Sequence, residues 1–226
     1  YSSALFTPET KTLEQAQHAK YERILTQLGA RQGDSILEIG CGWGGFAEYA
    51  AAKRGLRVTC LTISQAQYDF AVARIDRAGL ADRVTIKLQD YRDEHGVYDG
   101  IASIEMFEAV GEKYWPTYFA TLRERLKPGR QATLQIITIG DDRFPLYRRS
   151  VDFIQKYIFP GGMLPSPSAL QAEIARADAD EPGVQALREE VLTLRSMLEG
   201  IVEFRPDEVT CAMELAELSV KDPEGS

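Results

Sequence analysis

A strand, a glycine-rich turn and a helix follow one another directly in the first quarter of this 226-residue chain. The apolar run Ser35-Ile-Leu-Glu-Ile39 predicts a short buried strand, and Phe46 to Lys53 has the apolar spacing of a helix. Between them lies Gly40-Cys-Gly-Trp-Gly-Gly45. Glycines at such a crossing let the backbone turn sharply and approach a ligand. The arrangement therefore predicts the opening unit of a doubly wound α/β fold.

The same alternation of strands and helices continues along the chain. Strands separated by helices of about 10–15 residues predict a mainly parallel sheet covered on both faces. The expected fold class is therefore α/β, with a doubly wound, Rossmann-like sheet. We expect helices over residues 12–28, 46–53, 65–78, 114–126 and 167–177, and strands over residues 35–39, 57–63, 84–88, 100–104 and 131–139.

Charge divides the chain into two parts. Residues 1–177 hold 22 Lys and Arg against 21 Asp and Glu, whereas residues 178–226 hold 4 against 13. We expect a nearly neutral domain over 1–177, followed by a linker, an amphipathic helix and an acidic tail over 178–226. The apolar stripe of that helix, at 184–201, fits either a helix that packs on the domain or the seam of a homodimer, and its shortness favours the first.

Composition excludes several classes of protein. With 44% hydrophobic and 27% charged residues the chain is typical of a globular protein. No run of about 20 apolar residues predicts a membrane-spanning helix, and the first residues lack a signal-peptide pattern. The three cysteines, at 41, 60 and 211, lie in no metal-binding pattern, so we expect no metal and a reducing environment. The balanced charge of the main domain argues against a nucleic acid partner.

The glycine turn alone fits several kinds of nucleoside-binding protein. A dinucleotide enzyme normally has an acidic residue about 20 positions further on, where it holds a ribose. That place reads Cys60-Leu-Thr-Ile-Ser64, without a carboxylate. The carboxylate lies instead at Glu38, inside the first strand, which is how methyltransferases of this fold are commonly written. A tight strand-to-helix turn without a ligand is the alternative interpretation.

Six motifs stand out along residues 1–177. They are Tyr1-Ser-Ser3, Leu37-Glu-Ile-Gly-Cys-Gly-Trp-Gly-Gly45, Leu61-Thr-Ile-Ser64 with Gln67, Leu88-Gln-Asp-Tyr-Arg-Asp93, Met106-Phe-Glu-Ala-Val-Gly111 and Tyr157-Ile-Phe-Pro-Gly-Gly162. In order and spacing they resemble the cyclopropane-fatty-acyl-phospholipid synthase family. The resemblance implies an S-adenosylmethionine-dependent C-methyltransferase that acts on the cis double bond of an unsaturated phospholipid acyl chain and closes it to a cyclopropane. It also implies a cytoplasmic protein, peripheral to the inner face of the membrane.

The resemblance assigns cofactor-binding residues position by position. Glu38 is expected to orient the methionine end and its ammonium. Gln89 and Asp90 follow the third expected strand, where they are placed to contact adenine edges, and ordinary turn residues are the alternative for both. The expected cofactor-binding set is Tyr1, Ser2, Glu38, Gly40, Gly42, Gly44, Thr62, Gln67, Gln89, Asp90 and Tyr91.

The implied chemistry holds an alkene and a methyl group in line and then removes a proton from a cation away from water. In the family a bound bicarbonate takes this proton. Glu108 matches the glutamate that helps to hold it, and a carboxylate at a helix N-terminus is the alternative. Ser3 and Tyr157 complete the expected catalytic set. Because the family often has Cys where Ser3 stands and His where Ile137 stands, we expect an altered bicarbonate shell, with N–H groups near Ile139 and with Tyr157 as substitutes.

Residues 140–167 form a long irregular stretch, which is typical of a functional lid. Phe153, Tyr157 and Phe159 are expected to cover the acyl chain while Arg148 and Arg149 face lipid phosphate. A surface helix that carries arginines is the alternative interpretation.

The resemblance ends after residue 177, where the family continues with further strands of the sheet. We therefore expect the sheet to be incomplete at its C-terminal end, with an exposed edge. Two other functions stay open. One is an S-adenosylmethionine-dependent methyltransferase with a different acceptor, which Ser3 and Ile137 favour. The other is an inactive cofactor-binding module, which the unfamiliar tail favours.

Overall fold

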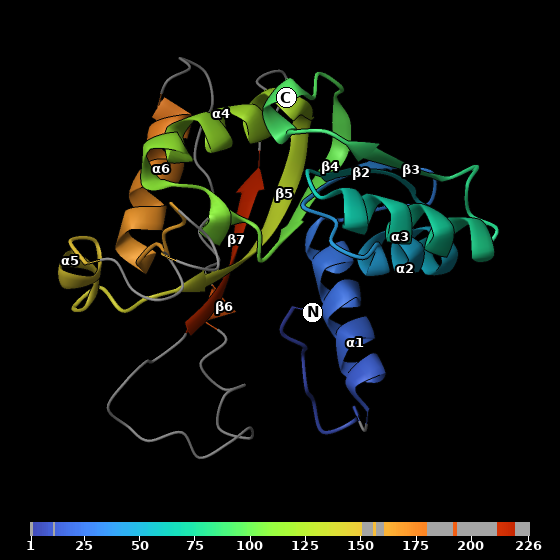
Figure 1. Cartoon of the computed structure of the whole chain (residues 1–226), viewed down its shortest axis with the longest axis horizontal. Coiled ribbons are helices and arrows are strands. Elements are labelled where there is room, and N and C mark those ends of the chain that lie inside the picture. Colours follow the sequence, from blue (N-terminus) through green and yellow to red (C-terminus); the bar gives the residue numbers. More distant parts are fainter. Residues whose placement is uncertain are drawn as a thin grey trace, which may run out of the picture.

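In the computed structural model, helices cover both faces of one twisted sheet (Figure 1). The structure describes residues 2–10, 12–150, 156, 161–179, 192–193 and 212–219, and only the backbone of residues 178–179, 192–193 and 212–219. Within these residues the strand order is β3-β2-β1-β4-β5-β7-β6. The expected α/β class with a doubly wound sheet is confirmed.

The helices and strands have the following bounds. The strands are β1 (Ser35–Ile39), β2 (Arg57–Thr62), β3 (Val84–Leu88), β4 (Tyr98–Ile104), β5 (Leu126–Thr138), β6 (Leu192–Thr193) and β7 (Ala212–Ser219). The α-helices are α1 (Leu13–Gln27), α2 (Gly45–Arg54), α3 (Gln65–Arg77), α4 (Trp115–Arg125), α5 (Phe144–Tyr147) and α6 (Pro167–Ala179). Three short 3-10 helices are η1 (Tyr91–Asp93), η2 (Phe107–Ala109) and η3 (Glu112–Tyr114).

Strands β1 to β5 run parallel, with β1 at the centre. Ile36 of β1 pairs with Val58 on one side and with Gly100 on the other. Four of the five residues of β1 are buried, because helices lie on both faces of this strand. All five parallel strands therefore end at the same edge of the sheet, which is where ligands bind in open α/β folds.

Two apolar cores hold the helices on the sheet. Apolar residues of α1, α2 and α3, among them Leu25, Phe46 and Ile75, pack on one face. Aromatic and aliphatic residues of α4 and α6, among them Tyr118 and Leu170, pack on the other. Figure 1 shows these two layers on opposite sides of the sheet. None of the described helices is long and apolar enough to cross a membrane.

Strand β5 starts earlier than the expected strand over 131–139. Tyr98 of β4 pairs with Leu126, but Gly100 pairs with Gln131, so the segment between them bulges out of the pairing. The turn residues 127–129 are part of this bulge. Beyond β5, the irregular stretch contains the four-residue helix α5, and residues 151–155 and 157–160 lie outside the described residues.

The C-terminal edge of the sheet differs from the expectation of an exposed edge. Strand β7 pairs antiparallel with β5 from Gln131↔Ser219 to Thr138↔Ala212, and β6 pairs with β7. An unpaired β5 would leave a row of backbone donors and acceptors without partners, and β7 supplies them. Residues 192–193 of the expected amphipathic helix lie in β6, and the rest of that helix lies outside the described residues.

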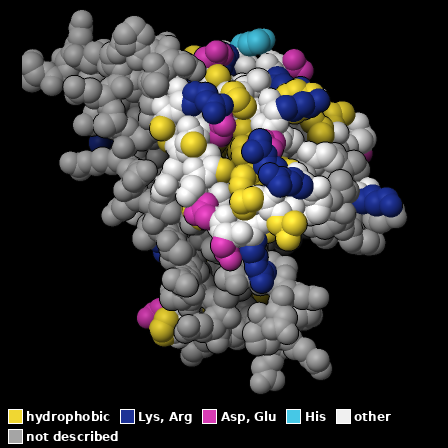
Figure 2. Space-filling view, turned by 90° about the vertical axis from the view of Figure 1, so that its left-hand side faces the viewer, with side chains coloured by type: hydrophobic (Ala, Val, Ile, Leu, Met, Phe, Trp, Pro, Cys, Tyr) yellow, Lys and Arg dark blue, Asp and Glu magenta, His cyan; other side chains and the backbone are white. Residues whose placement is uncertain are grey.

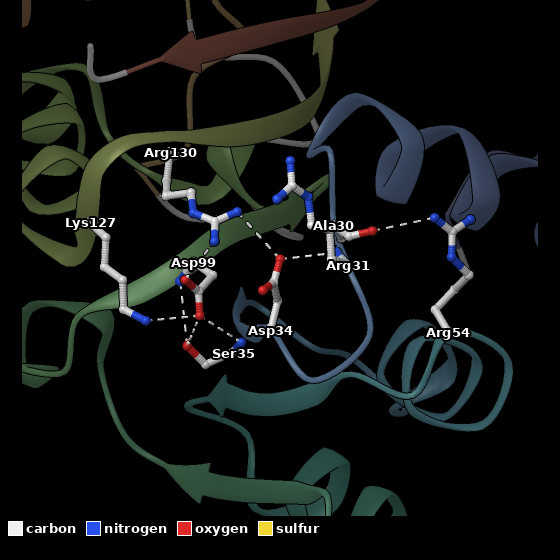
Figure 3. Close-up of polar contacts among 8 residues, drawn as sticks. All are labelled: Ala30, Arg31, Asp34, Ser35, Arg54, Asp99, Lys127 and Arg130. Carbon is white, nitrogen blue, oxygen red and sulfur yellow. Dashed lines mark hydrogen bonds and ion pairs between the residues drawn. The ribbon is translucent and has the colours of Figure 1, made fainter. Parts of the chain in front are cut away.

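The amino ends of β1 and β4 are joined by a network of charged side chains (Figure 3). The Asp99 carboxylate accepts hydrogen bonds from the N–H and the hydroxyl of Ser35 at 3.0 and 2.9 Å. It also pairs with Lys127 at 2.9 Å and with Arg130 at 3.1 Å. Arg130 extends the network to Asp34 at 3.4 Å. This network lies at the edge of the sheet opposite the glycine turn.

Candidate active site

The glycine turn is tied to the neighbouring strand at the carboxyl edge of the sheet. The N–H groups of Gly40 and Cys41 both donate to the carbonyl oxygen of Leu61 at 3.0 Å. Gly40, Gly42 and Gly44 have φ angles of +81°, +52° and +77°. This left-handed region costs other residues about 1–2 kcal/mol each. The turn therefore favours glycine at all three predicted positions.

Two glycines also lie against neighbouring elements. A Cβ atom at Gly40 would lie 2.5 Å from Cγ of Met106, and one at Gly45 would lie 2.9 Å from Oη of Tyr21. The tight-turn interpretation accounts for these two positions. Gly44, the N-cap of α2, makes no side-chain capping bond, so the first N–H groups of the helix face the turn without a side-chain cap. A helix start of this kind favours anionic groups.

Glu38 lies in β1 beneath the turn and is 2% exposed. Its Oε2 accepts a hydrogen bond from Sγ of Cys60 at 3.5 Å. Burial raises the pKa of Glu38 well above its ordinary value, Cys41 adds to the rise, and Lys20 and Arg74 oppose it. Burial thus favours the neutral carboxyl, and a cationic group brought close to Glu38 would favour its charged form.

Thr62, at the end of β2, brings three predicted residues together. Its Oγ1 donates to Oε1 of Gln67 at 2.8 Å and accepts from the N–H of Ser64 at 3.2 Å. Its carbonyl oxygen accepts from the N–H of Gln89 at 2.9 Å. The ends of β2 and β3 and the start of α3 therefore form one polar cluster of Thr62, Gln67 and Gln89, which Gln89 joins through its backbone N–H while its side-chain amide donates to Oε2 of Glu94 at 3.4 Å.

The Asp90 side chain makes its contacts within the turn that follows β3. Its carboxylate accepts from the N–H of Arg92 at 2.9 Å and pairs with the Arg92 guanidinium at 2.7 Å. The hydrogen bonds from Arg92 lower the pKa of Asp90. Both carboxylate oxygens have partners within the turn, which supports the interpretation of Asp90 as a turn residue. The half-buried Tyr91 packs edge-on against Tyr118, with ring centroids 5.4 Å apart.

The first residues of the chain lie between α1 and the residue that follows β4, and they contact residues that were not predicted from the sequence. Ser2 Oγ accepts a hydrogen bond from Nζ of Lys20 at 2.6 Å, and the carbonyl oxygen of Ser3 accepts a second at 2.8 Å. The Ser3 N–H donates to Oε1 of Glu105 at 2.9 Å. Gln135, from β5, donates to the same oxygen at 2.8 Å. Tyr1 lies outside the described residues.

One of these missed residues carried a signal in the sequence. Lys20 stands four residues after Ala16 and four before Ile24, so it interrupts the apolar stripe of a predicted helix. A charge in such a stripe indicates a buried partner. Glu105 carried no comparable signal, because polar residues directly after a strand are common.

Glu108 lies in η2, between the site and β5. Its Oε1 accepts a hydrogen bond from the backbone N–H of Ile137, and its Oε2 is buried and has no partner among the described residues. Burial raises the pKa of Glu108 to about 7, and the nearby Glu105 adds to this. A buried carboxyl oxygen without a partner is costly, which indicates that it binds a ligand or a proton.

The sequence predicts that backbone N–H groups near Ile139 replace the missing histidine, and two of these groups already have partners within the protein. The N–H of Ile137 donates to Glu108, and that of Ile139 donates to the carbonyl oxygen of Pro165 at 3.0 Å. Ser3 contacts Glu105, three residues before Glu108. Tyr157 lies outside the described residues. Among the described residues no three His, Cys, Asp or Glu side chains converge as a metal site requires.

The described start of the predicted lid carries basic residues on a mixed surface. Arg148 pairs with Glu112 of η3 at 2.6 Å, and Arg149 is exposed. Figure 2, which faces the side of α5 and α6, shows Lys and Arg side chains among hydrophobic and acidic ones. The charge of Arg148 is therefore partly balanced by the protein itself. Phe153 and Phe159, expected to cover an acyl chain, lie outside the described residues.

Comparisons with known proteins point in one direction. The family described as mycolic acid cyclopropane synthetase matches residues 1–214. Tuberculostearic acid methyltransferase UfaA1 of Mycobacterium tuberculosis is 44% identical over 177 residues, which cover 75% of this chain and 41% of that protein. Cyclopropane-fatty-acyl-phospholipid synthase of Escherichia coli K12 is 43% identical over 165 residues, 73% of this chain and 41% of that protein. The chain thus spans about two fifths of the length of these relatives.

Solved structures share the fold. The mycolic acid cyclopropane synthase CmaA1, in a complex with SAH and CTAB, is 28% identical and superimposes with a TM-score of 0.75. The match covers 87% of this chain and 70% of CmaA1. A geranyl diphosphate methyltransferase that is 18% identical has a TM-score of 0.73, which shows the fold alone. Since the family match covers most of its residues and includes every described part of the site, the chain belongs to the mycolic acid cyclopropane synthetase family.

Proposed function

We propose that this chain transfers a methyl(ene) group from S-adenosylmethionine to the cis double bond of an unsaturated phospholipid acyl chain, forming a cyclopropane. The family supports this activity, as do the name of the Escherichia coli relative and the SAH in the CmaA1 complex. The observation that carries the proposal is Glu108. It offers a buried carboxyl with one unpartnered oxygen and a pKa near neutrality, close to the residues predicted for the cofactor.

The residues at the carboxyl edge fit S-adenosylmethionine. The cluster of Thr62, Gln67 and Gln89 offers hydroxyl and amide groups from three elements. The uncapped start of α2 faces the glycine turn, where it favours the carboxylate of a bound amino acid moiety. When bound, the cofactor supplies an electrophilic methyl group, and the role of the chain is to hold this group in line with the alkene.

The described residues offer bicarbonate few donors. The N–H groups of Ile137 and Ile139 are both engaged, and Ile137 adds no polar side-chain atom. The described polar groups around Glu108 Oε2 include the buried hydroxyl of Tyr118. Tyr157, expected in the same shell, lies outside the described residues. We therefore derive no step through bicarbonate.

Glu108 itself is suited to remove the proton. Once the alkene has taken the methyl carbon from sulfur, with the C–S electron pair left on S-adenosylhomocysteine, one C–H bond of that carbon would break, its electron pair would close the ring, and the proton would pass to the Glu108 carboxylate. Burial raises the pKa of Glu108 to about 7, so its carboxylate is a stronger base than an exposed one while a large share remains ionised at neutral pH.

We infer further that the lipid reaches the site from the inner face of a membrane. Three apolar side chains are exposed near the turn and the start of α3: Trp43, Ile63 and Phe70 are 38%, 79% and 46% exposed. Trp43 and Phe70 stack edge to face, with centroids 5.3 Å apart. Paired aromatic side chains at a surface suit the boundary between water and lipid.

Incubation with labelled S-adenosylmethionine and vesicles of unsaturated phospholipid, followed by lipid mass analysis, tests the proposal. A gain of one CH₂ with loss of the double bond is the expected result. Glu108→Gln should lower the rate by about 100-fold or more while S-adenosylhomocysteine affinity stays within about threefold. Glu124→Gln, at an exposed position of α4, is the control.

The pH profile gives a second readout of the same role. Because the carboxylate accepts the proton, the rate should rise as pH increases through about 7, the pKa of Glu108. Removal of bicarbonate and dissolved CO₂ should leave the rate unchanged. Strong residual turnover in Glu108→Gln, or a rate that depends on bicarbonate, would contradict the assigned role.

A second product is favoured by one observation. Ile137 stands where the family often has histidine, and the relative named tuberculostearic acid methyltransferase is 44% identical. Transfer without ring closure would give a methyl branch or a methylene group in the same mass analysis. Binding of S-adenosylhomocysteine without any turnover would instead favour an inactive cofactor-binding module.

A further inference from the structure

Helix α1 buries a charged residue in the middle of its apolar stripe. Lys20 is 4% exposed and lies between the fully buried residues Ala16 and Ile24. Removal of an ammonium group from water costs several kcal/mol unless partners replace the water. A lysine at this position is therefore expected to serve something other than the packing of the helix.

The partners of Lys20 belong to the first residues of the chain. Both hydrogen bonds that the structure gives Nζ go to this segment, one to Ser2 Oγ at 2.6 Å and one to the carbonyl oxygen of Ser3 at 2.8 Å. Gln17, one turn earlier on α1, donates to the carbonyl oxygen of Ser2 at 2.6 Å. We call residues 2–3 the strap. Three hydrogen bonds fix it to one face of α1.

The other side of the strap is fixed to the end of β4. The Ser3 N–H donates to Glu105 Oε1, and Gln135 of β5 holds the same oxygen. Glu105 has a φ of +49°, the only positive φ of a residue other than glycine in the described part of the chain. Such strain persists where surrounding contacts impose it, and it is common at functional sites.

We propose that Lys20 is a positioning residue whose ammonium group holds the strap between α1 and Glu105, the residue that follows β4, where the strap completes the S-adenosylmethionine site. The inference rests on the proposed cofactor but not on the acceptor. Lys20 acts through Ser2 and Ser3, and it bonds the strap through a backbone oxygen as well as a hydroxyl. An apolar side chain of similar length would fill the same space and would release the strap.

The charge of Lys20 makes the effect sensitive to pH. Burial lowers the pKa of Lys20 to about 8, while Glu105 and Glu38 oppose the shift. Among the described residues Tyr21 also faces Nζ, with its ring centroid 5.1 Å away and its pKa raised to about 12 by burial. As pH rises through about 8, Lys20 loses its proton, the hydrogen bonds to the strap weaken, and cofactor affinity should fall.

Calorimetric titration with S-adenosylhomocysteine tests the role in three variants of the full chain. Lys20→Met should weaken binding by about 10- to 100-fold, as expected for loss of charged hydrogen bonds. Lys20→Arg should keep the affinity within a few-fold and, because guanidinium stays charged, should flatten the loss of affinity between pH 7 and 9. Lys53→Met, at an exposed position near the end of α2, should bind like the wild type.

Two further measurements separate positioning from a structural role. Removal of one partner from a buried charged contact can destabilise the fold strongly, so the thermal midpoint of Lys20→Met is measured first and its titrations are run well below that midpoint, where the variant is folded. Amide hydrogen exchange in the ligand-free protein should accelerate at residues 2–5 and stay unchanged in β1. Equal affinity in Lys20→Met and wild type, or unchanged exchange at the strap, would overturn the inference. Wild-type protein that binds no S-adenosylhomocysteine would instead overturn the proposed function, and the exchange measurement would still decide the role of Lys20.

Discussion

The close approach of Gly40, in the glycine turn, to Met106 leads to a prediction about the free energy of unfolding. Gly40 combines a φ of +81° with a close approach, because a Cβ atom there would lie 2.5 Å from Cγ and 2.8 Å from Cβ of Met106. The Cβ of Met106 is fixed by its backbone and cannot swing away as a chain end does. Gly40→Ala must therefore move either the turn or the segment after β4.

Gly33 offers a matched comparison. Its φ is +88°, but nothing lies within 4 Å of a Cβ atom built on it. For Gly33→Ala we expect a loss of about 1 kcal/mol in the free energy of unfolding, because the left-handed conformation costs about 1–2 kcal/mol and a less flexible unfolded chain returns about 0.4–1 kcal/mol. Gly40→Ala adds overpacking of about 1–3 kcal/mol, which gives a total of about 2–4 kcal/mol.

Urea unfolding of both variants, followed by circular dichroism, measures this difference. Gly40→Ala should be the less stable variant, and it should also bind S-adenosylhomocysteine more weakly, whereas Gly33→Ala should bind normally. Met106→Ala, which removes Cγ, should recover part of the lost stability when combined with Gly40→Ala. Equal losses in the two glycine variants would show that conformation alone, and not contact with Met106, explains the glycine at position 40.

Two other predictions concern charged groups. The hydrogen bonds from Ser35 and Lys127 lower the pKa of Asp99 to about 2, below its unfolded value, although burial opposes this. The network in Figure 3 therefore stabilises the fold above about pH 4 and loses that contribution as pH falls through about 2. In urea unfolding, Asp99→Asn should lower the free energy of unfolding at pH 7 and should lower it less at pH 2. Arg149→Ala should weaken binding to anionic vesicles about fivefold in a sedimentation assay, because a basic residue near such a surface contributes about 1 kcal/mol. Adding Arg148→Ala to Arg149→Ala should change vesicle binding less, because Glu112 already pairs with Arg148. Unchanged vesicle binding in the double variant would contradict a role of these arginines in binding lipid phosphate.

Much of the fold followed from local patterns. The spacing of apolar residues predicted all five parallel strands and the larger helices. A strand buried on both faces needs a continuous apolar run, and a helix with one buried face needs apolar residues three or four positions apart. Glycines at 40, 42 and 44 marked the turn because other residues rarely adopt its φ angles. The family resemblance placed Thr62, Gln67 and Gln89 in one cofactor site, and the structure brings the three together because parallel strands end at a common edge.

The contacts that define the site chemistry are long-range. Oε1 of Glu108 accepts a hydrogen bond from the backbone N–H of Ile137. Because nearly every residue type has such an N–H group, the sequence cannot indicate this contact. The strap is held by Lys20 and Glu105, which stand 17 and 102 residues from Ser3. Strand β7, which no clear sequence pattern indicates, pairs with β5, whereas the sequence predicts an open edge there.

The sequence by itself determined the layered architecture, the edge of the sheet that carries the site and the glycines at its turn, because these depend on periodicity and on the conformational limits of single residues. Only the tertiary structure decided which partners the buried charged groups have. Glu108 Oε2 has none among the described residues, and the Lys20 ammonium binds the strap. The reason is that the protonation and orientation of a buried group depend on the neighbours that packing brings to it, and those neighbours come from distant parts of the chain.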